Sequence, residues 1–397
     1  MAKLKQHTPP VEGRFYLRTV VPRWLAAVAS LSGSILGIAT SLYSSAFRDA
    51  ISSSGKHLSI LISTVLTAFV ASGSTLLIYR WIFHRREDRA QIVRARLVIG
   101  SDALDSVSNE HDLIAGRTLH YLEAQRPSED LLIFLHGLGL DASDFRAYMA
   151  ESRFHCIALT LYGFNTEEKN DEHYKPISLQ SHVQLLAYAL RKVRSAHPNK
   201  RVTLIGFSFG ADLIFFLMQY AASAARDLNI RKAILLDPNI NELTTTISSR
   251  VAIMDNNQPL AELIKILESA ASVSEFRNLC EYLYKITSKD FGQIQRHAQE
   301  VLALYTGLSY DRFLDRMGQL SSITEGIHIV LSFDYEQHFN IIARGAVARG
   351  MDPRSLECSR CGHFELIGTN FLKETLEGVL ATGLDNLRVR IIACTGP

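Results

Sequence analysis

A strand pattern that runs into a glycine–serine–glycine turn, and then into an apolar helix pattern, constrains this chain more than any other stretch. Residues 201–213 read R-V-T-L-I-G-F-S-F-G-A-D-L. The run Val202–Ile205 is rich in β-branched and aliphatic residues, which is typical of a strand buried on both faces. A helix-like apolar segment follows over residues 211–222. In this context the G-x-S-x-G pattern predicts a sharp turn that exposes the Ser208 hydroxyl.

The glycines of this turn and the helix behind it suit Ser208 to act as a nucleophile. Gly206 and Gly210 stand on either side of the serine, where the lack of a side chain lets the strand and the helix approach each other. The N-terminus of the helix offers oriented N–H groups and a positive dipole end to an oxyanion. We therefore predict that Ser208 is the nucleophile and that the Phe209 N–H helps to bind the anion that forms.

Two long uncharged segments near the N-terminus predict a membrane anchor. Residues 24–43 and 57–79 contain no Asp, Glu, Lys or Arg, and a membrane-spanning helix needs about 20 apolar residues. Basic residues lie before the first segment and after the second, whereas the link at 48–56 carries few charges. This distribution predicts that both ends are cytoplasmic. We expect residues 1–86 to be a two-span anchor and the rest of the chain to be cytoplasmic.

The remainder of the chain predicts one α/β domain. Charge returns over residues 87–109, which we interpret as a linker helix. From residue 110 to residue 397, strand-like and helix-like patterns alternate, as expected for a mostly parallel sheet covered by helices. Only helical patterns occur between Asn239 and Gly326, so this segment is expected to interrupt the alternation.

Composition excludes some classes of function. The formal net charge is +2, so composition does not indicate a nucleic-acid partner. Cys358 and Cys361 form a C-x-x-C pair, but no second pair accompanies it as a zinc site would require. We predict neither a metal nor a cofactor.

His363 is the best placed of the fourteen histidines to serve as the base for Ser208. It follows the strand pattern of residues 355–361 and precedes a closing helix pattern. A nucleophile, an acid and then a histidine is also the chain order expected for a strand–turn–helix serine site. His136 follows a strand too, but it belongs to an H-G-x-G loop with another role.

The carboxylate that would orient His363 has three candidates. Asp334 comes at the end of the strand pattern of residues 327–333, and Glu336 lies two residues further on. Asp237 follows the preceding strand pattern. We favour Asp334 because it is closest to the strand end, with Glu336 as the alternative and Asp237 as the third candidate.

The other half of an oxyanion site is predicted in the loop after the apolar run of residues 131–135. This loop begins with His136 and Gly137 and continues through Leu138. Its glycines allow the backbone to turn, so that the Leu138 N–H faces the substrate carbonyl together with that of Phe209.

Three motifs in order, H-G-L-G-L, G-F-S-F-G and C-G-H-F, make the chain from about residue 113 resemble the α/β-hydrolase superfamily. The resemblance implies an eight-stranded, mostly parallel sheet with helices on both faces. It also implies a triad of Ser208, Asp334 and His363, and a helical lid formed by residues 239–326.

These expectations combine into a functional hypothesis. The chain is expected to be a membrane-anchored serine hydrolase that cleaves a carboxylic ester of an acylated or lipid molecule through an acyl-enzyme on Ser208. A thioesterase or an amidase would use the same triad. A membrane-tethered binding module without catalysis is the alternative from another class of function.

Overall fold

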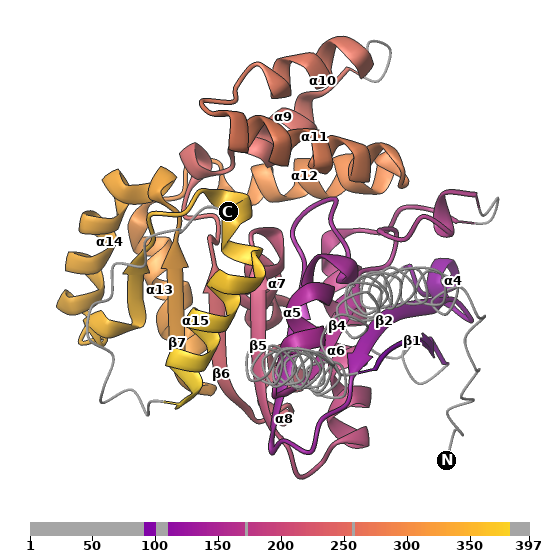
Figure 1. Cartoon of the computed structure of the whole chain (residues 1–397), viewed down its shortest axis with the longest axis vertical. Coiled ribbons are helices and arrows are strands. Elements are labelled where there is room, and N and C mark those ends of the chain that lie inside the picture. Colours follow the sequence, from indigo (N-terminus) through magenta and orange to yellow (C-terminus); the bar gives the residue numbers. More distant parts are fainter. Residues whose placement is uncertain (1–90, 101–109, 171–173, 256–258, 382–397) are drawn as a thin grey trace, which may run out of the picture. The chain divides into compact units, whose positions relative to one another are not determined.

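The computed structural model describes residues 91–100, 110–170, 174–255 and 259–381. In these residues an eight-stranded sheet has the order β1-β2-β4-β3-β5-β6-β7-β8 (Figure 1). Strands β3 to β8 are parallel, and β2 pairs antiparallel with β1 and β4, which confirms the expected mostly parallel sheet. The strands are β1 (Ile92–Val98), β2 (Thr118–Ala124), β3 (Asp130–Leu135), β4 (His155–Thr160), β5 (Arg201–Phe207), β6 (Ile230–Leu236), β7 (Thr324–Leu331) and β8 (Leu356–Cys358).

The interpretation of residues 87–109 as a linker helix is wrong for residues 92–98. These residues form β1, which pairs antiparallel with the whole length of β2 at the edge of the sheet. Arg94 is exposed, and Arg96 makes an exposed ion pair with Glu167. Charged side chains of this kind are tolerated on an edge strand, where they also discourage pairing with another chain. The charge that suggested a solvated helix therefore belongs to the edge of the sheet.

Helices cover both faces of the sheet, and for this reason its central strands are unbroken apolar runs. Every residue of β3 is buried, as is every residue of β4. Figure 1 shows α5 and α15 in front of the sheet, while α6, α7, α8 and α13 pack together behind it. These helices are α5 (Arg146–Glu151), α6 (Leu179–Ala196), α7 (Phe209–Tyr220), α8 (Ala222–Asp227), α13 (Tyr310–Ser321) and α15 (Thr369–Ala381). Along the chain, the short α4 (His111–Ile114) precedes β2, and α14 (Glu336–Ala348) connects β7 to β8.

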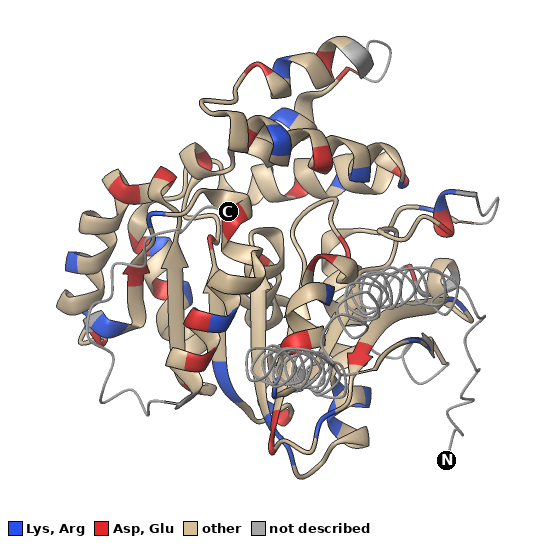
Figure 2. Ribbon diagram, viewed as in Figure 1, with Lys and Arg blue, Asp and Glu red and all other residues tan. Residues whose placement is uncertain are grey.

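The chain between β6 and β7 is helical and supplies the helices that we call the lid. The lid consists of α9 (Thr246–Ile253), α10 (Pro259–Leu267), α11 (Val273–Thr287) and α12 (Phe291–Tyr305). These helices lie above the carboxyl ends of the parallel strands (Figure 1). Side-chain caps start two of them, because Ser272 accepts the Glu275 N–H and Asp290 accepts the Gln293 N–H. Acidic and basic residues are mixed along α10 and α11 (Figure 2), so their polar faces carry no field of one sign.

The chain divides into two units, residues 1–89 and residues 90–397, and the sheet and its lid belong to the second. The predicted membrane spans, 24–43 and 57–79, lie outside the described residues. In the part of the chain that the structure describes, no helix combines the length and the hydropathy needed to cross a membrane.

Candidate active site

Ser208 occupies the sharp turn between β5 and α7 that the sequence predicts. Its backbone has φ 51° and ψ −121°, a conformation that residues other than glycine rarely adopt. The turn is held because the Ser208 N–H donates to the Leu236 carbonyl of β6 at 2.7 Å. Strain of this kind at a non-glycine residue costs about 1–3 kcal/mol and persists only where the surrounding structure enforces it. The serine stays partly exposed at the carboxyl end of the sheet.

The two glycines of the turn are required by close approach of the backbone. A Cβ atom at Gly210 would lie 2.2 Å from the carbonyl oxygen of Leu135, the last residue of β3. A Cβ atom at Gly206 would lie 2.5 Å from the carbonyl oxygen of Gly210. The helix that follows the serine can therefore begin directly against the end of β3 only because both positions lack a side chain.

His363 is paired with Asp237. Its Nδ1 donates to the Asp237 Oδ2 at 2.6 Å, and the other carboxylate oxygen accepts the Ser332 N–H at 2.7 Å. The Asp237 side chain is fully buried, while 19% of the His363 side chain is exposed. The aspartate thus has no contact with water, and both of its oxygens are bound by groups of fixed position. The imidazole ring keeps one side open to solvent.

The register of the sheet brings Ser208 to the same place. Phe207 of β5 pairs with Leu236 of β6, so Ser208 and Asp237 are the residues that follow two neighbouring strand ends. The Phe207 ring lies 4.7 Å from the His363 ring, measured between centroids. The structure therefore places Ser208 and Asp237, with His363, at the carboxyl end of the parallel strands.

The expectation that Asp334 orients His363 is corrected by this geometry. Asp334 lies in a single 3-10 turn, Phe333–Tyr335, beyond the end of β7. Its carboxylate is 3.4 Å from the Ser332 hydroxyl, and burial together with the nearby Asp237 carboxylate raises the pKa of Asp334. Glu336 begins α14. The strand nearer to Ser208, β6, provides the partner of the histidine.

His136 fixes the loop in which a second oxyanion donor was predicted. Its Nδ1 donates to the Gly137 carbonyl at 2.8 Å, and its Nε2 accepts the Leu161 N–H at 3.1 Å. The side chain is fully buried. Burial, together with the charge of Lys289, lowers the pKa of His136 to about 3. The ring is therefore neutral at pH 7, as one donor and one acceptor require.

Residues Gly137 to Leu140 form a tight turn. The Leu140 N–H donates to the Gly137 carbonyl at 3.1 Å, and Gly139 has φ 77°. Leu138 is the second residue of this turn, so its N–H is not the one that closes it. Phe209 is the first residue of α7, where a helix leaves its N–H groups without intrahelical acceptors. The residues predicted as oxyanion donors thus stand at a turn and at a helix N-terminus.

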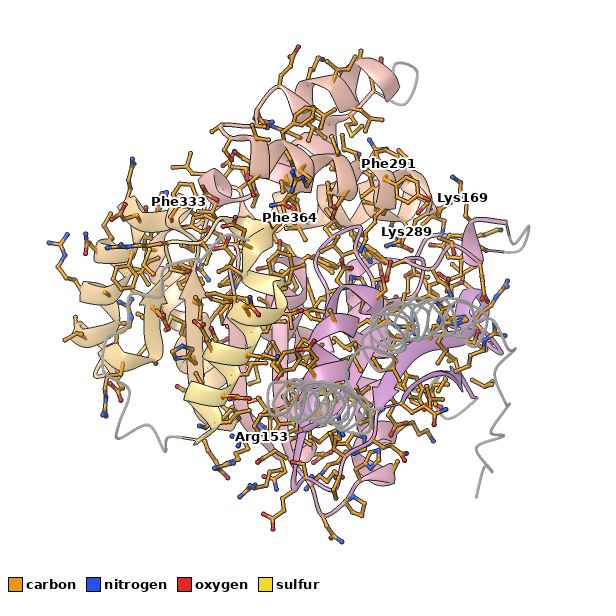
Figure 3. The ribbon with its side chains drawn as sticks, viewed as in Figure 1. Arg153, Lys169, Lys289, Phe291, Phe333 and Phe364 are labelled. Atoms are coloured by element: carbon orange, nitrogen blue, oxygen red, sulfur yellow. The ribbon has the colours of Figure 1, made fainter. Side chains whose placement is uncertain are left out.

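The lid holds this turn through a buried lysine that the sequence analysis did not single out. This residue is Lys289, which is labelled in Figure 3. Its Nζ donates to the Gly139 carbonyl at 2.7 Å and lies 2.8 Å from Asp141 Oδ2. Only 1% of the Lys289 side chain is exposed. Burial alone would raise the pKa of Asp141, but the charge and hydrogen bond of Lys289 outweigh it and hold that pKa well below its usual range. A second ion pair joins Lys285 of α11 to Asp144.

A cavity of about 180 Å³ lies between the lid and this turn. Leu140, Phe364 and Tyr282 contribute to its wall, but Ser208 and His363 do not. Phe364 connects the cavity to His363, because the two ring centroids lie 5.1 Å apart. Among the described residues, the buried Tyr282 hydroxyl has no hydrogen-bond partner. The wall also includes Asp144, Asn278, Glu281 and Lys285, so the cavity is lined by both apolar and charged groups.

The close approach at Gly210 predicts a large loss of stability on substitution. We expect Gly210→Ala to lower the free energy of unfolding by at least about 2 kcal/mol, because the new methyl group overlaps a backbone oxygen. Gly378 in α15 is the matched control, since no atom lies within 4 Å of its added Cβ. Alanine at position 378 is expected to raise the free energy of unfolding by roughly 0.5–1 kcal/mol. Urea denaturation measures both, and equal effects would contradict this account of Gly210.

The buried neutral His136 predicts a loss of stability in acid. An unfolded histidine takes up a proton below its usual pKa of 6.5, whereas folded His136 does so only near pH 3. Because of this residue, the free energy of unfolding therefore falls by about 1.4 kcal/mol per pH unit as the pH falls from 6.5 towards 3. In urea titrations at pH 7, 6 and 5, His136→Gln should show a slope with pH that is shallower by about one proton. An unchanged slope would mean that His136 takes up its proton at the same pH in the folded and the unfolded chain.

Comparison with known proteins agrees with this geometry. A model of the alpha/beta hydrolase family matches residues 132–367. No curated protein matches the chain. Three similar solved structures are a carboxylesterase of Nitrososphaera gargenis, a membrane phospholipase A described as a bacterial virulence factor, and 1H-3-hydroxy-4-oxoquinoline 2,4-dioxygenase.

The carboxylesterase is 17% identical, with 66% of this chain and 94% of that chain covered and a TM-score of 0.47. The phospholipase is 15% identical, with 83% and 99% covered and a TM-score of 0.45. The dioxygenase is 18% identical, with 66% and 97% covered and a TM-score of 0.47. At these TM-scores the structural similarity does not indicate which reaction this chain catalyses. The family match, which spans more than half of the sequence, shows that the chain belongs to the alpha/beta hydrolase family.

Proposed function

We propose that this protein is a serine hydrolase that cleaves carboxylic esters through an acyl-enzyme on Ser208. The observation that carries the proposal is the bond between His363 Nδ1 and the buried Asp237 carboxylate, beside a serine held at φ 51°. A buried aspartate on one ring nitrogen leaves the other nitrogen as the basic one. A histidine prepared in this way is the base that a serine nucleophile needs.

In the proposed reaction, His363 Nε2 takes the Ser208 proton while Oγ attacks the ester carbonyl. Asp237 holds the ring in the tautomer with the proton on Nδ1 and stabilises the imidazolium that forms. The N–H groups of Leu138 and Phe209 bind the oxyanion. The imidazolium then protonates the leaving alcohol, and water releases the acid from Ser208 by the same steps.

The cavity under the lid supports an ester with an apolar part. Leu140 and Phe364 offer apolar wall to an acyl or aryl group, while Asp144, Glu281 and Lys285 make the rest of the wall charged. Its volume of about 180 Å³ is smaller than the roughly 300–1,000 Å³ of common ligand pockets. A long acyl chain would therefore need the lid to move. Thioesters and amides pass through the same kind of oxyanion, so they belong in the substrate panel.

The proposed hydrolase is also proposed to be held at a membrane with its catalytic domain in the cytoplasm. Support comes from the sequence alone, through the two uncharged segments 24–43 and 57–79 and the basic residues outside them. Such an anchor would place Ser208 near substrates dissolved in the bilayer. Each acyl CH₂ costs about 0.8 kcal/mol to move into water, so a soluble enzyme would meet little free long-chain ester.

Labelling by a fluorophosphonate, combined with hydrolysis of esters, thioesters and amides of matched acyl groups, tests the reaction. We expect the full-length protein to be labelled once, at Ser208, and to hydrolyse an ester fastest. Ser208→Ala should remove labelling and lower the rate by several orders of magnitude. Labelling and turnover that survive in Ser208→Ala would refute the proposal. If a thioester or an amide were hydrolysed faster than the ester, the proposed triad would stand and the proposed substrate class would change.

The assignment of the acid is tested by a pair of aspartate substitutions. Asp237→Asn should lower kcat by about 10⁴-fold, because an amide at this position favours the wrong tautomer of His363. Asp334→Asn is the matched control and should change kcat by much less, since the Asp334 carboxylate is not the partner of Nδ1. Circular dichroism checks that both variants fold. The reverse order of the two effects would return the role to Asp334.

The membrane arrangement is tested by labelling single cysteines placed in the link at residues 48–56 with an impermeant maleimide. Intact cells should be labelled there, because the link is predicted to face the outside while both ends stay in the cytoplasm. A cysteine placed in residues 1–20 should react only after the cells are opened. Labelling of the link only in opened cells would overturn the predicted topology.

A further inference from the structure

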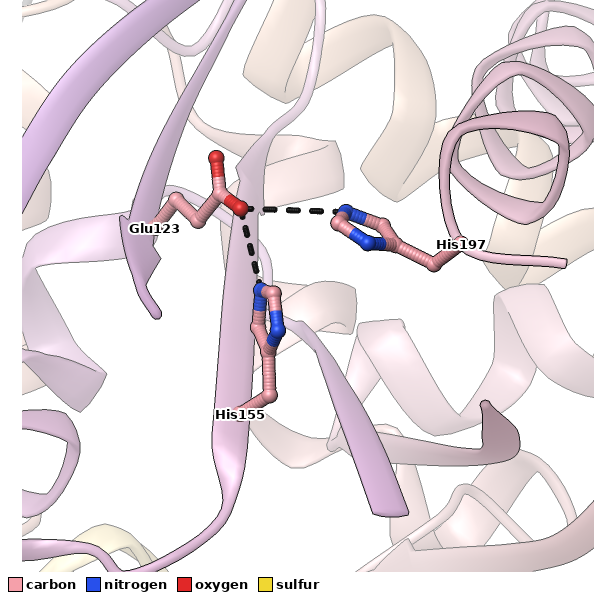
Figure 4. Close-up of side chains that lie close together, drawn as sticks. All are labelled: Glu123, His155 and His197. Atoms are coloured by element: carbon pink, nitrogen blue, oxygen red, sulfur yellow. Dashed lines mark hydrogen bonds and ion pairs between the residues drawn. The ribbon is translucent and has the colours of Figure 1, made fainter. Parts of the chain in front are cut away.

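A second group of reactive side chains lies at the opposite end of the sheet from Ser208. Glu123 comes from β2, His155 begins β4, and His197 directly follows α6 (Figure 4). The Glu123 Oε1 is 3.0 Å from His155 Nε2 and 3.7 Å from His197 Nε2. One donor atom from each residue lies within 4.8 Å of the other two. The three donors thus converge on one point from three separate elements.

We propose that Glu123, His155 and His197 bind a zinc ion, with water as the fourth ligand. Two imidazoles and a carboxylate are an established ligand set for Zn²⁺ in proteins. Donor atoms bound at about 2.0–2.2 Å to a tetrahedral zinc lie about 3.3–3.5 Å apart. The two separations from Glu123, 3.0 and 3.7 Å, fall on either side of this value. The third, between the two histidines, is at most 4.8 Å, so their rings must approach each other by up to about 1.4 Å to bind the ion.

The surroundings suit an ion that is held firmly and hydrated on one side. The His155 side chain is 3% exposed, whereas those of Glu123 and His197 are 14% and 19% exposed, which leaves a path for water. The His155 and His197 rings meet edge to face with centroids 4.7 Å apart, so each limits the rotation of the other. Gln125 donates from its amide to Glu123 Oε1 at 3.1 Å, as outer-sphere partners of metal ligands commonly do.

The hydrogen bond that now joins two of the ligands must give way to the ion. His155 Nε2 donates to Glu123 Oε1 at 3.0 Å. When zinc binds, the ring of His155 carries its proton on Nδ1 instead, so that Nε2 can offer its lone pair to the ion.

One neighbouring charge opposes a cation, and its position limits its effect. Lys200 follows His197 by three residues, so its charge lies near the group. Its Nζ, however, is bound to the carbonyl oxygens of Ser128 and Arg126. The ammonium group is therefore held by backbone acceptors and does not occupy the space between the three ligands.

The location assigns the ion a structural role. Across β3, His155 lies level with Val202, six residues before Ser208 along β5. At about 3.3 Å per residue this places the ligands about 20 Å from the serine along the strands. The ion would join β2 to β4 and to the end of α6, and so stabilise the antiparallel side of the sheet. It is not needed for the proposed hydrolysis.

Zinc titration of the full-length protein, purified without a histidine tag and stripped with a chelator, tests the proposal. We expect one zinc per chain by calorimetry and a higher Tm when zinc is added. His197→Gln and Glu123→Gln should each weaken zinc binding by about 100-fold or more, since even outer-sphere changes cost 10–100-fold. Both variants should lose the zinc-dependent rise in Tm, and in the presence of chelator both should unfold near the wild-type temperature.

His120→Gln is the matched control, because this histidine also lies on β2 but pairs with Glu167 outside the group. It should bind zinc as the wild type does. Failure of the wild type to bind one zinc, or unchanged binding by both His197→Gln and Glu123→Gln, would overturn the proposal. Loss of binding in His120→Gln alone would also overturn it, because the ion would then lie elsewhere.

Discussion

The contact between the start of α7 and the end of β3 is the constraint on which the site depends. At Gly210 the helix lies so close to the Leu135 carbonyl that a methyl group would overlap the oxygen. Leu135 is followed at once by His136 and its turn, and Gly210 follows Ser208 and Phe209. One backbone contact therefore sets the separation of the serine from the turn that carries Leu138. Two chain segments far apart in sequence can act on one carbonyl only if this distance is fixed.

Local patterns were enough to predict the parts of the site that depend on consecutive residues. The turn at Ser208, the loop beginning at His136 and the position of His363 after the last strand each follow from strand, glycine and helix signals within a few residues. The mostly parallel order of the sheet follows from alternation of strand-like and helix-like segments. These features needed no knowledge of which strands become neighbours.

The parts that escaped prediction depend on neighbours in space. Asp237 and Asp334 both follow apolar strands, and only the packing of His363 against Phe207 decides between the carboxylates. Residues 92–98 were misinterpreted because two arginines in an edge strand have the composition of a solvated helix. Lys289 sits between two helix patterns and has no local signal of burial. Its partners, Gly139 and Asp141, lie about 150 residues earlier in the chain.

Through Lys289, the lid holds the turn at residues 137–140 in addition to lying over the site. Lys289 bonds to the very turn that shapes the proposed anion-binding pocket, and it belongs to the segment that would have to swing aside for a bulky molecule. Moving the lid would leave the partly exposed Asp141 without the charge of Lys289 and would remove the hydrogen bond to the Gly139 carbonyl. The proposed enzyme would then bind a bulky substrate only in the open form and cleave it only after the lid had closed. In the proposed hydrolase, a small ester that meets the open form would then leave without being cleaved.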